Sequence, residues 1–171
     1  MMKLNEIAKK ADGTYVGTNI DKESKDRIKR LVLELGVQNG IRSDKMHVTL
    51  IYSRKYVPTL KAETSPYPMK AIGSSLEIFP TQDDKNALVM KLKCDELIDR
   101  HNQLMSEYQT TYDYDEYIPH ITLSYDCGDF DPTSYTGEFP LVTITDEYVE
   151  DLVLYWQNKE KKHDERRTDR D

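Results

Sequence analysis

The chain has 171 residues and a formal net charge of −7 at pH 7, with 31 acidic residues against 24 lysines and arginines. This length permits one well-packed domain, or two small lobes that share a core. The acidic balance argues against a long DNA or RNA partner, because proteins that hold long nucleic acid without sequence preference are usually basic. The acidic charge is still compatible with a small anionic ligand that a few polar groups hold. No apolar run approaches the ~20 residues of a membrane-spanning helix, so we expect no membrane partner.

Two further features predict a cytoplasmic protein. Cys94 and Cys127 lie far apart in the sequence and lack metal-binding spacing, so we expect two reduced thiols. Residues 1–6 lack the apolar core of a signal peptide. The sequence predicts neither a metal site nor a cofactor.

The first predicted elements are a strand and a helix. Residues 13–20 alternate between apolar and polar positions, which predicts a strand with Tyr15 pointing away from the core. Asp21 or Ser24 can cap the helix that follows, and Gly36 suits its end because glycine tolerates the left-handed conformation. Four apolar residues recur within it at helical spacing: Ile28, Leu31, Val32 and Leu35.

A strand and a long loop come next. Residues 46–52 alternate again and predict a strand that carries His47. Three prolines among polar residues at 54–70 predict a loop without regular structure, which in a compact domain is either disordered or a functional flap. A strand at 70–79 and a turn at 82–85 follow.

The rest of the chain begins as the first part did. Residues 86–93 predict a strand, Asp95 is a candidate cap for a helix to about Gln109, and a tyrosine-rich linker leads to a strand at 118–125. After a loop at 126–138, we expect two strands, at about 139–145 and 148–156. Residues 158–171 are a run of mixed charges without apolar residues, which predicts a disordered tail.

Two of these strands carry the same four-residue pattern. His47-Val48-Thr49-Leu50 returns as His120-Ile121-Thr122-Leu123. The leading strand precedes the histidine by 33 positions from Thr14 to His47, and by 34 from Asn86 to His120. This spacing indicates an internal repeat with pseudo-twofold symmetry. We therefore expect a single domain of residues 1–157, with lobes of about 13–70 and 71–157, and leave open a strand exchange between them.

The repeated pattern is suited to acid–base catalysis. On a strand, His47 and Thr49 share one face, and His120 and Thr122 do the same. A fold that places the strands side by side would bring two imidazoles and two hydroxyls together. The unperturbed imidazole pKa of about 6.5 allows one copy to be neutral while the other is protonated.

Other interpretations of the histidines stay open. His47 and His120 would also suit zinc, but no third ligand lies at helical or hairpin spacing. They would be inert surface residues if the duplication were coincidental. His101 fits a core or boundary position in its helix, and His163 lies in the charged tail.

With its doubled histidine–threonine strands, the chain resembles the two-histidine (2H) phosphoesterase superfamily over about residues 14–156. Within that superfamily it is most similar to the phage anti-CBASS nucleases, which degrade the cyclic oligonucleotide alarm signals of infected bacteria. The resemblance implies that His47 and His120 are the acid–base pair and that Thr49 and Thr122 bind the phosphate. Tyr117, in the tyrosine-rich linker, is a further candidate for a substrate contact. The resemblance also suggests three substrate contacts: Tyr15, Glu150 and Trp156. For the last two, a solvated carboxylate and a core side chain are the competing interpretations.

The resemblance implies an α+β fold, two-lobed and pseudo-symmetric, with mostly antiparallel sheets flanking a central cleft and helices outside. The implied activity is metal-independent hydrolysis of 3′–5′ bonds in cyclic di- or trinucleotides such as 3′,3′-cyclic GMP–AMP. The alternatives are an RNA 2′,3′-cyclic phosphodiesterase and a non-catalytic protein that sequesters cyclic nucleotides. The sequence indicates neither the oligomeric state nor which histidine is the base.

Overall fold

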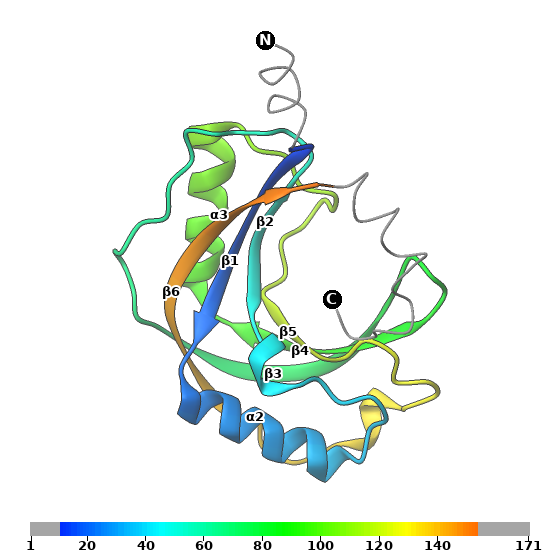
Figure 1. Ribbon diagram of the computed structural model, residues 1–171. Coiled ribbons are helices and arrows are strands. Elements are labelled where there is room, and N and C mark those ends of the chain that lie inside the picture. The colour runs from blue at the N-terminus through cyan, green and yellow to red at the C-terminus, as the bar shows by residue number, and fades with distance from the viewer. Residues whose placement is uncertain (1–10, 154–171) are drawn as a thin grey trace.

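The computed structural model describes residues 11–153 (Figure 1). The strands are β1 (Gly13–Ile20), β2 (Val48–Ser53), β3 (Met69–Pro80), β4 (Asn86–Lys93), β5 (His120–Ser124) and β6 (Leu141–Leu152). The helices are α2 (Lys22–Leu35) and α3 (Asp95–Tyr108), with short 3₁₀ turns at η1 (Ser43–Lys45) and η2 (Pro132–Ser134). The predicted α+β class is confirmed.

The six described strands form one antiparallel sheet in the order β2-β1-β6-β3-β4-β5. We call β2, β1 and β6 the first half of the sheet, and β3, β4 and β5 the second half. Each half has a strand of the repeated pattern at its outer edge and the leading strand of the repeat beside it. Figure 1 shows the sheet strongly curved, with the first half rising above β3 and β4. This arrangement has the pseudo-symmetry that the repeat predicts.

One face of the sheet packs against the two helices, and the hydrophobic core lies between them (Figure 1). The side chains of α2 and α3 that enter this core include Ile28, Leu31, Leu97 and Leu104. From the sheet they meet apolar residues of every strand, among them Val16, Leu50, Met69, Met90, Leu123 and Ile144. Neither helix in residues 11–153 has the length and apolarity of a membrane-spanning helix.

The helix ends follow local capping chemistry in one case and not in the other. In α2 the Asp21 carboxylate accepts a hydrogen bond of 2.8 Å from the Ser24 amide, and Gly36 ends the helix at φ 66°. Both predictions for this helix are confirmed. In α3 the cap residue is Cys94, without a side-chain hydrogen bond, and Asp95 is the first helical residue. The prediction that Asp95 caps this helix is wrong, although its charge still favours the first turn.

β6 is one continuous strand rather than the two that the sequence predicts. Its start pairs with β3 and its longer remainder with β1. The register with β1 shifts between Asn19 and Ile20, so that Thr145 is the extra residue of a bulge. A bulge bends a strand without ending its pairing, which explains how one strand serves both neighbours.

Residues 54–68 form an ordered loop that packs on the helix-covered side of the sheet. Val57 and Leu60 enter the core, and the Val57 amide donates to the Thr14 hydroxyl. The Tyr67 hydroxyl donates to Glu147 in β6 over 2.7 Å. Of the two alternatives for this loop, the structure excludes disorder, and these contacts hold it against the core.

Glu147 also forms a buried ion pair with Arg100 of α3. The two guanidinium contacts measure 2.7 and 3.0 Å, and the side chains are 2% (Arg100) and 0% (Glu147) exposed. Burial alone would raise the pKa of Glu147, but hydrogen bonds from Arg100, Tyr67 and the Glu63 amide outweigh it, and the pKa is lowered. The pair joins the helix that follows β4 to the central strand of the sheet.

Candidate active site

The two histidine strands are the outer strands of the sheet, and the curvature brings them close to each other. The Ile41 amide, ahead of β2, donates to the Leu123 carbonyl of β5 over 2.8 Å. In the opposite direction, the Tyr117 hydroxyl, ahead of β5, donates to the Thr49 carbonyl of β2 over 2.7 Å. Each strand is therefore held by the segment that precedes the other strand.

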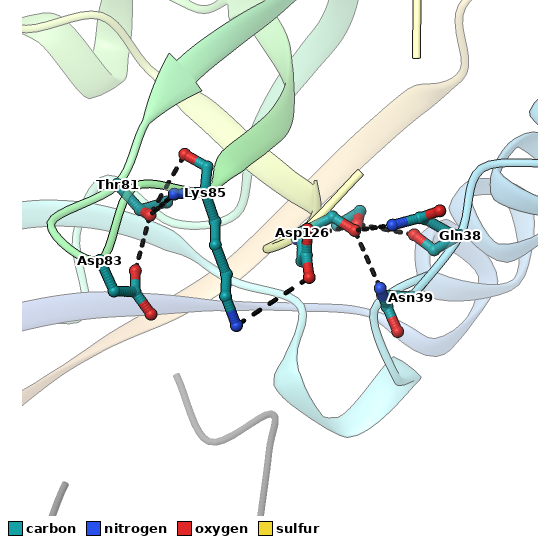
Figure 2. A network of polar contacts seen from close by, with 7 residues as sticks. Gln38, Asn39, Thr81, Asp83, Lys85 and Asp126 are labelled. Carbon is teal, nitrogen blue, oxygen red and sulfur yellow. Dashed lines mark hydrogen bonds and ion pairs between the residues drawn. The ribbon is translucent and has the colours of Figure 1, made fainter. Parts of the chain in front are cut away.

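A polar network ties the ends of these segments together on the surface. The side-chain amides of Gln38 and Asn39, before β2, donate to the Asp126 carbonyl, just after β5. The Asp126 carboxylate lies 3.9 Å from the Lys85 ammonium, in the turn between β3 and β4. Figure 2 shows these contacts together with those that brace the turn through Thr81. The network fixes where the second histidine strand ends relative to the first.

Both histidines have the same internal hydrogen bond. His47 Nδ1 lies 2.8 Å from the Lys45 carbonyl oxygen, and His120 Nδ1 lies 2.7 Å from that of Ile118. A carbonyl oxygen can only accept, so Nδ1 carries a proton in both rings. Nε2 is thereby left as the basic atom of the neutral imidazole, or as the second donor when the ring is protonated.

A bulge follows the threonine at the same position in both strands. On β1, Gly17 pairs with Thr49 and Val16 with Ile51, so that Leu50 is the extra residue. On β4, Val89 pairs with Thr122 and Leu88 with Ser124, which makes Leu123 the extra one. Both leucines are fully buried. Each threonine is half-buried and precedes its buried leucine, so alternation turns it to the face opposite the core.

His120 has a depressed pKa with a mixed set of causes. Burial lowers it most, and the charge of His47 lowers it further, whereas the bond to Ile118 and the carboxylate of Glu77 raise it. Both histidines are half-buried and share a face with their half-buried threonines, opposite the core. The Phe79 ring packs edge-on against His120 with a centroid distance of 5.0 Å.

Tyr15 lies beside the first histidine and contacts its threonine. The Tyr15 and Thr49 hydroxyls share a hydrogen bond of 2.8 Å, and the Tyr15 ring centroid is 6.4 Å from that of His47. Gly17 leaves room for this ring, because a Cβ there would lie 2.8 Å from Tyr15 and 2.6 Å from the Tyr148 hydroxyl. Burial raises the pKa of Tyr15 well above its usual value, so the phenol stays protonated and can donate to Thr49.

The other predicted substrate contacts have different surroundings. Glu150 is exposed and pairs directly with Tyr15 across β1 and β6, so the two side chains share a face. Tyr117 is 9% exposed, and its hydroxyl is bonded to the Thr49 carbonyl. This contact makes it a support of β2. Trp156 and the tail of residues 158–171 lie outside the described residues.

His101 supports β2 from the same side as Tyr117. Its Nδ1 donates to the Leu50 carbonyl over 2.7 Å, and its ring stacks on Tyr117 at 4.2 Å and 7°. Burial lowers its pKa, so the ring is neutral at pH 7. The core position that the sequence suggests for His101 is confirmed, and its bond holds the strand that carries Thr49.

Three side chains near His120 were missed by the sequence analysis. Besides Phe79, these are Lys91, which pairs directly with His120 across β4 and β5, and Glu77, whose carboxylate lies 3.0 Å from the Lys91 ammonium. Alternation in β4 places Lys91 opposite the core, but which residue lies across from it depends on the strand register. Within residues 11–153, no group of three or more His, Cys, Asp or Glu side chains could hold a metal ion.

Solved structures share this fold at low sequence identity. The chain resembles one described as a phosphoesterase with a TM-score of 0.50 and 15% identity, covering 80% of this chain and 85% of that one. It also resembles E. coli LigT complexed with 3′-AMP, with a TM-score of 0.51 and 13% identity, covering 82% and 86%. The fold is therefore that of the two-histidine phosphoesterases, as predicted.

The sequence comparisons define the family more narrowly. The model of the family described as anti-CBASS protein Acb1 matches residues 12–159. The anti-CBASS protein Acb1 of Vibrio phage KVP40 is 39% identical over 155 residues, covering 91% of this chain and 97% of that protein. Its counterpart from Enterobacteria phage T4 is 35% identical over 157 residues with the same coverage. The chain belongs to the anti-CBASS Acb1 family.

Proposed function

We propose that the protein is a phosphodiesterase that counters CBASS immunity by hydrolysing 3′–5′ bonds of cyclic di- or trinucleotides, such as 3′,3′-cyclic GMP–AMP. Family membership and fold support the coarser part, a phosphodiesterase directed against CBASS. The observation that carries the chemistry is the pair of imidazoles held by the same Nδ1 contact, each with a threonine turned to the same face.

The first step is an internal transfer. The neutral imidazole accepts the proton of the ribose 2′-hydroxyl through Nε2, and the 2′-oxygen attacks the adjacent phosphorus. The bond from phosphorus to the 5′-oxygen breaks, and the protonated imidazole donates its Nε2 proton to that oxygen. Thr49 and Thr122 donate hydrogen bonds to the non-bridging oxygens as negative charge increases there. The ring opens to a linear product with a 2′,3′-cyclic phosphate.

The second step is hydrolysis with the roles exchanged. The imidazole that is now neutral accepts a proton from water, and the water oxygen attacks the cyclic phosphate. The other imidazole returns its proton to the departing ribose oxygen, which leaves a terminal phosphate. Both steps use only groups of the chain and need no metal. We assign His120 as the base of the first step, because its lowered pKa keeps it neutral near pH 7. His47 is then the acid.

Tyr15 and Glu150 are proposed to contact the substrate from the first half of the sheet. Their shared face and the closeness of Tyr15 to His47 support this. Trp156 stays a prediction from the resemblance, and the division into lobes near residue 70 stays a prediction from the internal repeat. The proposed place of action is the cytoplasm of the infected cell.

The experiment that tests the function is a substrate panel with EDTA present. The panel contains 3′,3′-cyclic GMP–AMP, cyclic tri-adenylate and an RNA that ends in a 2′,3′-cyclic phosphate, with products read by chromatography and mass spectrometry. Linear products with a terminal phosphate from the rings are the expected result. Cleavage of the RNA end alone would assign the protein to RNA processing. Rings that bind but survive would indicate sequestration, and activity abolished by EDTA would contradict the mechanism.

A further inference from the structure

The two histidines have different neighbours on the adjacent strands. On β1, Thr18 pairs with Val48, and the next residue, Asn19, lies on the side of that pair where His47 precedes Val48. The side-chain amide of Asn19 donates to the Asp146 carboxylate over 2.8 Å. At the corresponding place on β4 stands Lys91, directly across from His120. One position is thus a neutral amide beside an acid, and the other is a cation. The internal repeat explains why both halves have the same catalytic groups. It does not explain why one half has Asn19 where the other has Lys91.

The position of Lys91 suits a ligand that lies over the histidines. Directly paired residues on antiparallel strands project to the same face, with Cβ atoms about 4.5–5.5 Å apart. The Lys91 side chain is therefore beside the His120 imidazole, and its length lets the ammonium extend past the ring. Its side chain is 32% exposed, so most of it is packed while part of it stays in contact with water.

Glu77 pairs with the Lys91 ammonium, but a ligand can replace it there. Their ion pair of 3.0 Å is half open to water, with Glu77 47% exposed. Exposed pairs of this kind are weak, and a phosphate can take over the ammonium. The pair keeps a flexible lysine on this face and leaves its charge available.

A cyclic dinucleotide carries two phosphates, and the catalytic groups hold only one of them. The two threonines are neutral, and the imidazoles are engaged in proton transfer at the reacting phosphate. The second phosphate needs a cation at some distance from the reacting atoms. We propose that Lys91 binds this second, non-reacting phosphate and thereby makes the site prefer a ring to a one-phosphate substrate. This inference rests on the proposed function.

The test compares a substrate with two phosphates and a substrate with one. The probes are 3′,3′-cyclic GMP–AMP and adenosine 2′,3′-cyclic monophosphate, with kcat and KM measured for each. Lys91→Met should raise KM for the ring by about tenfold or more, as expected for the loss of a charge-assisted hydrogen bond. The increase should be at least about five times larger for the ring than for the mononucleotide. Glu77→Gln should lower KM for the ring, because the ammonium loses its competitor.

Lys93→Met is the matched control, since Lys93 lies two residues further along β4 on the same face and is exposed. It removes the same charge and should change KM for the ring by less than about twofold. Equal effects of the two lysine variants would overturn the proposal, and so would equal effects of Lys91→Met on both substrates.

Failure of the proposed function gives a different pattern. If the wild-type protein binds the ring without cleaving it, the same variants are compared by Kd, and Lys91→Met should weaken binding by the same factor. If the wild-type protein neither binds nor cleaves the ring, the function and this inference are both wrong.

Discussion

The two halves of the sheet carry the same histidine–threonine pattern in unlike surroundings. In the first half, tyrosines surround the motif: Tyr15 has Tyr52 and Tyr148 within 6.4 and 6.2 Å between ring centroids. In the second half, the neighbours of His120 are Phe79 and the Lys91–Glu77 pair. The proposed proton transfer uses the duplicated histidines and threonines. The residues that differ between the halves are the ones that we propose to contact the rest of the ring.

The difference between the halves bears on the proposed catalysis. Acid–base chemistry needs one neutral and one charged ring at the same pH. Burial lowers the pKa of His120 and so favours its neutral form, which suits the role of base that we propose for it.

The largest effect should come from removing either imidazole. His47→Asn and His120→Asn should each lower kcat by about 10³-fold or more, because each step needs both an acid and a base. The circular dichroism spectrum and the Kd for the ring should change little, because both side chains are only half-buried and lie outside the hydrophobic core. If one variant kept near-normal turnover, the two halves would not act as a pair.

The ion pair between Arg100 and Glu147 should have a large effect on stability. Glu147→Gln leaves a buried guanidinium with the more exposed Glu63 at 3.5 Å, and should cost about 3–5 kcal/mol of unfolding free energy. The double variant Arg100→Met, Glu147→Leu should lose less than the sum of the single variants. Urea unfolding measures both. The control is Asp26→Asn in the exposed pair with Lys22, expected to cost below about 1 kcal/mol.

The pH dependence of this stability follows from the sign of the shift. The folded-state pKa of Glu147 is lowered from 4.5, so the folded protein binds this proton less readily than the unfolded chain. Its contribution is therefore present above the unfolded pKa and is lost as pH falls through the folded one. The difference in urea midpoint between the wild type and Glu147→Gln should begin to shrink as pH falls below about 4.5, and should go on shrinking as pH falls through the folded-state pKa. A difference that stays constant well below that pH would contradict the assigned ion pair.

Much of the site could be predicted because its determinants are local. Strand alternation is enough to place His47 with Thr49 and His120 with Thr122, and the repeat indicates that they belong together. The cap at Asp21 and the helix end at Gly36 likewise depend only on residues that are close in the sequence. The α3 cap shows the limit of this approach. The sequence predicts Asp95 as the cap because of its side chain, whereas the structure has the preceding residue, Cys94, at that position.

The remaining features depend on pairing between distant segments. The bulges at Leu50 and Leu123 follow from how each strand meets its neighbour, and the alternation alone does not contain them. The same holds for the position of Lys91 across from His120 and for the contact of Tyr117 with the Thr49 carbonyl. Sequence spacing gives the face of a residue, but the register decides its neighbours.

Tyr15 offers a way to measure the difference between the two threonines. Tyr15→Phe removes the hydroxyl that Thr49 contacts and keeps the ring beside His47 and Tyr148. The loss of one hydrogen bond should lower kcat by about 3–10-fold, because the Thr49 hydroxyl is then free to turn away from the phosphate. The matching position near Thr122 holds Ala87, which has no hydroxyl: it lies two residues before Val89, as Tyr15 lies two residues before Gly17. Combining Tyr15→Phe with Thr49→Val should add little to Thr49→Val alone, whereas combining it with Thr122→Val should multiply the two losses. Multiplication in both combinations would show that Tyr15 acts on the substrate directly and not through Thr49.

The smallest expected effect is a shift of the acid limb of the pH–rate profile. Glu77 raises the pKa of His120, so Glu77→Gln should lower that pKa further. As the proposed base, His120 must be neutral, and kcat/KM falls as pH decreases through its pKa. The acid limb of Glu77→Gln should therefore move to lower pH, by less than about one pH unit because the carboxylate is half-exposed. A shift of the alkaline limb instead would assign His120 as the acid and exchange the roles of the two halves.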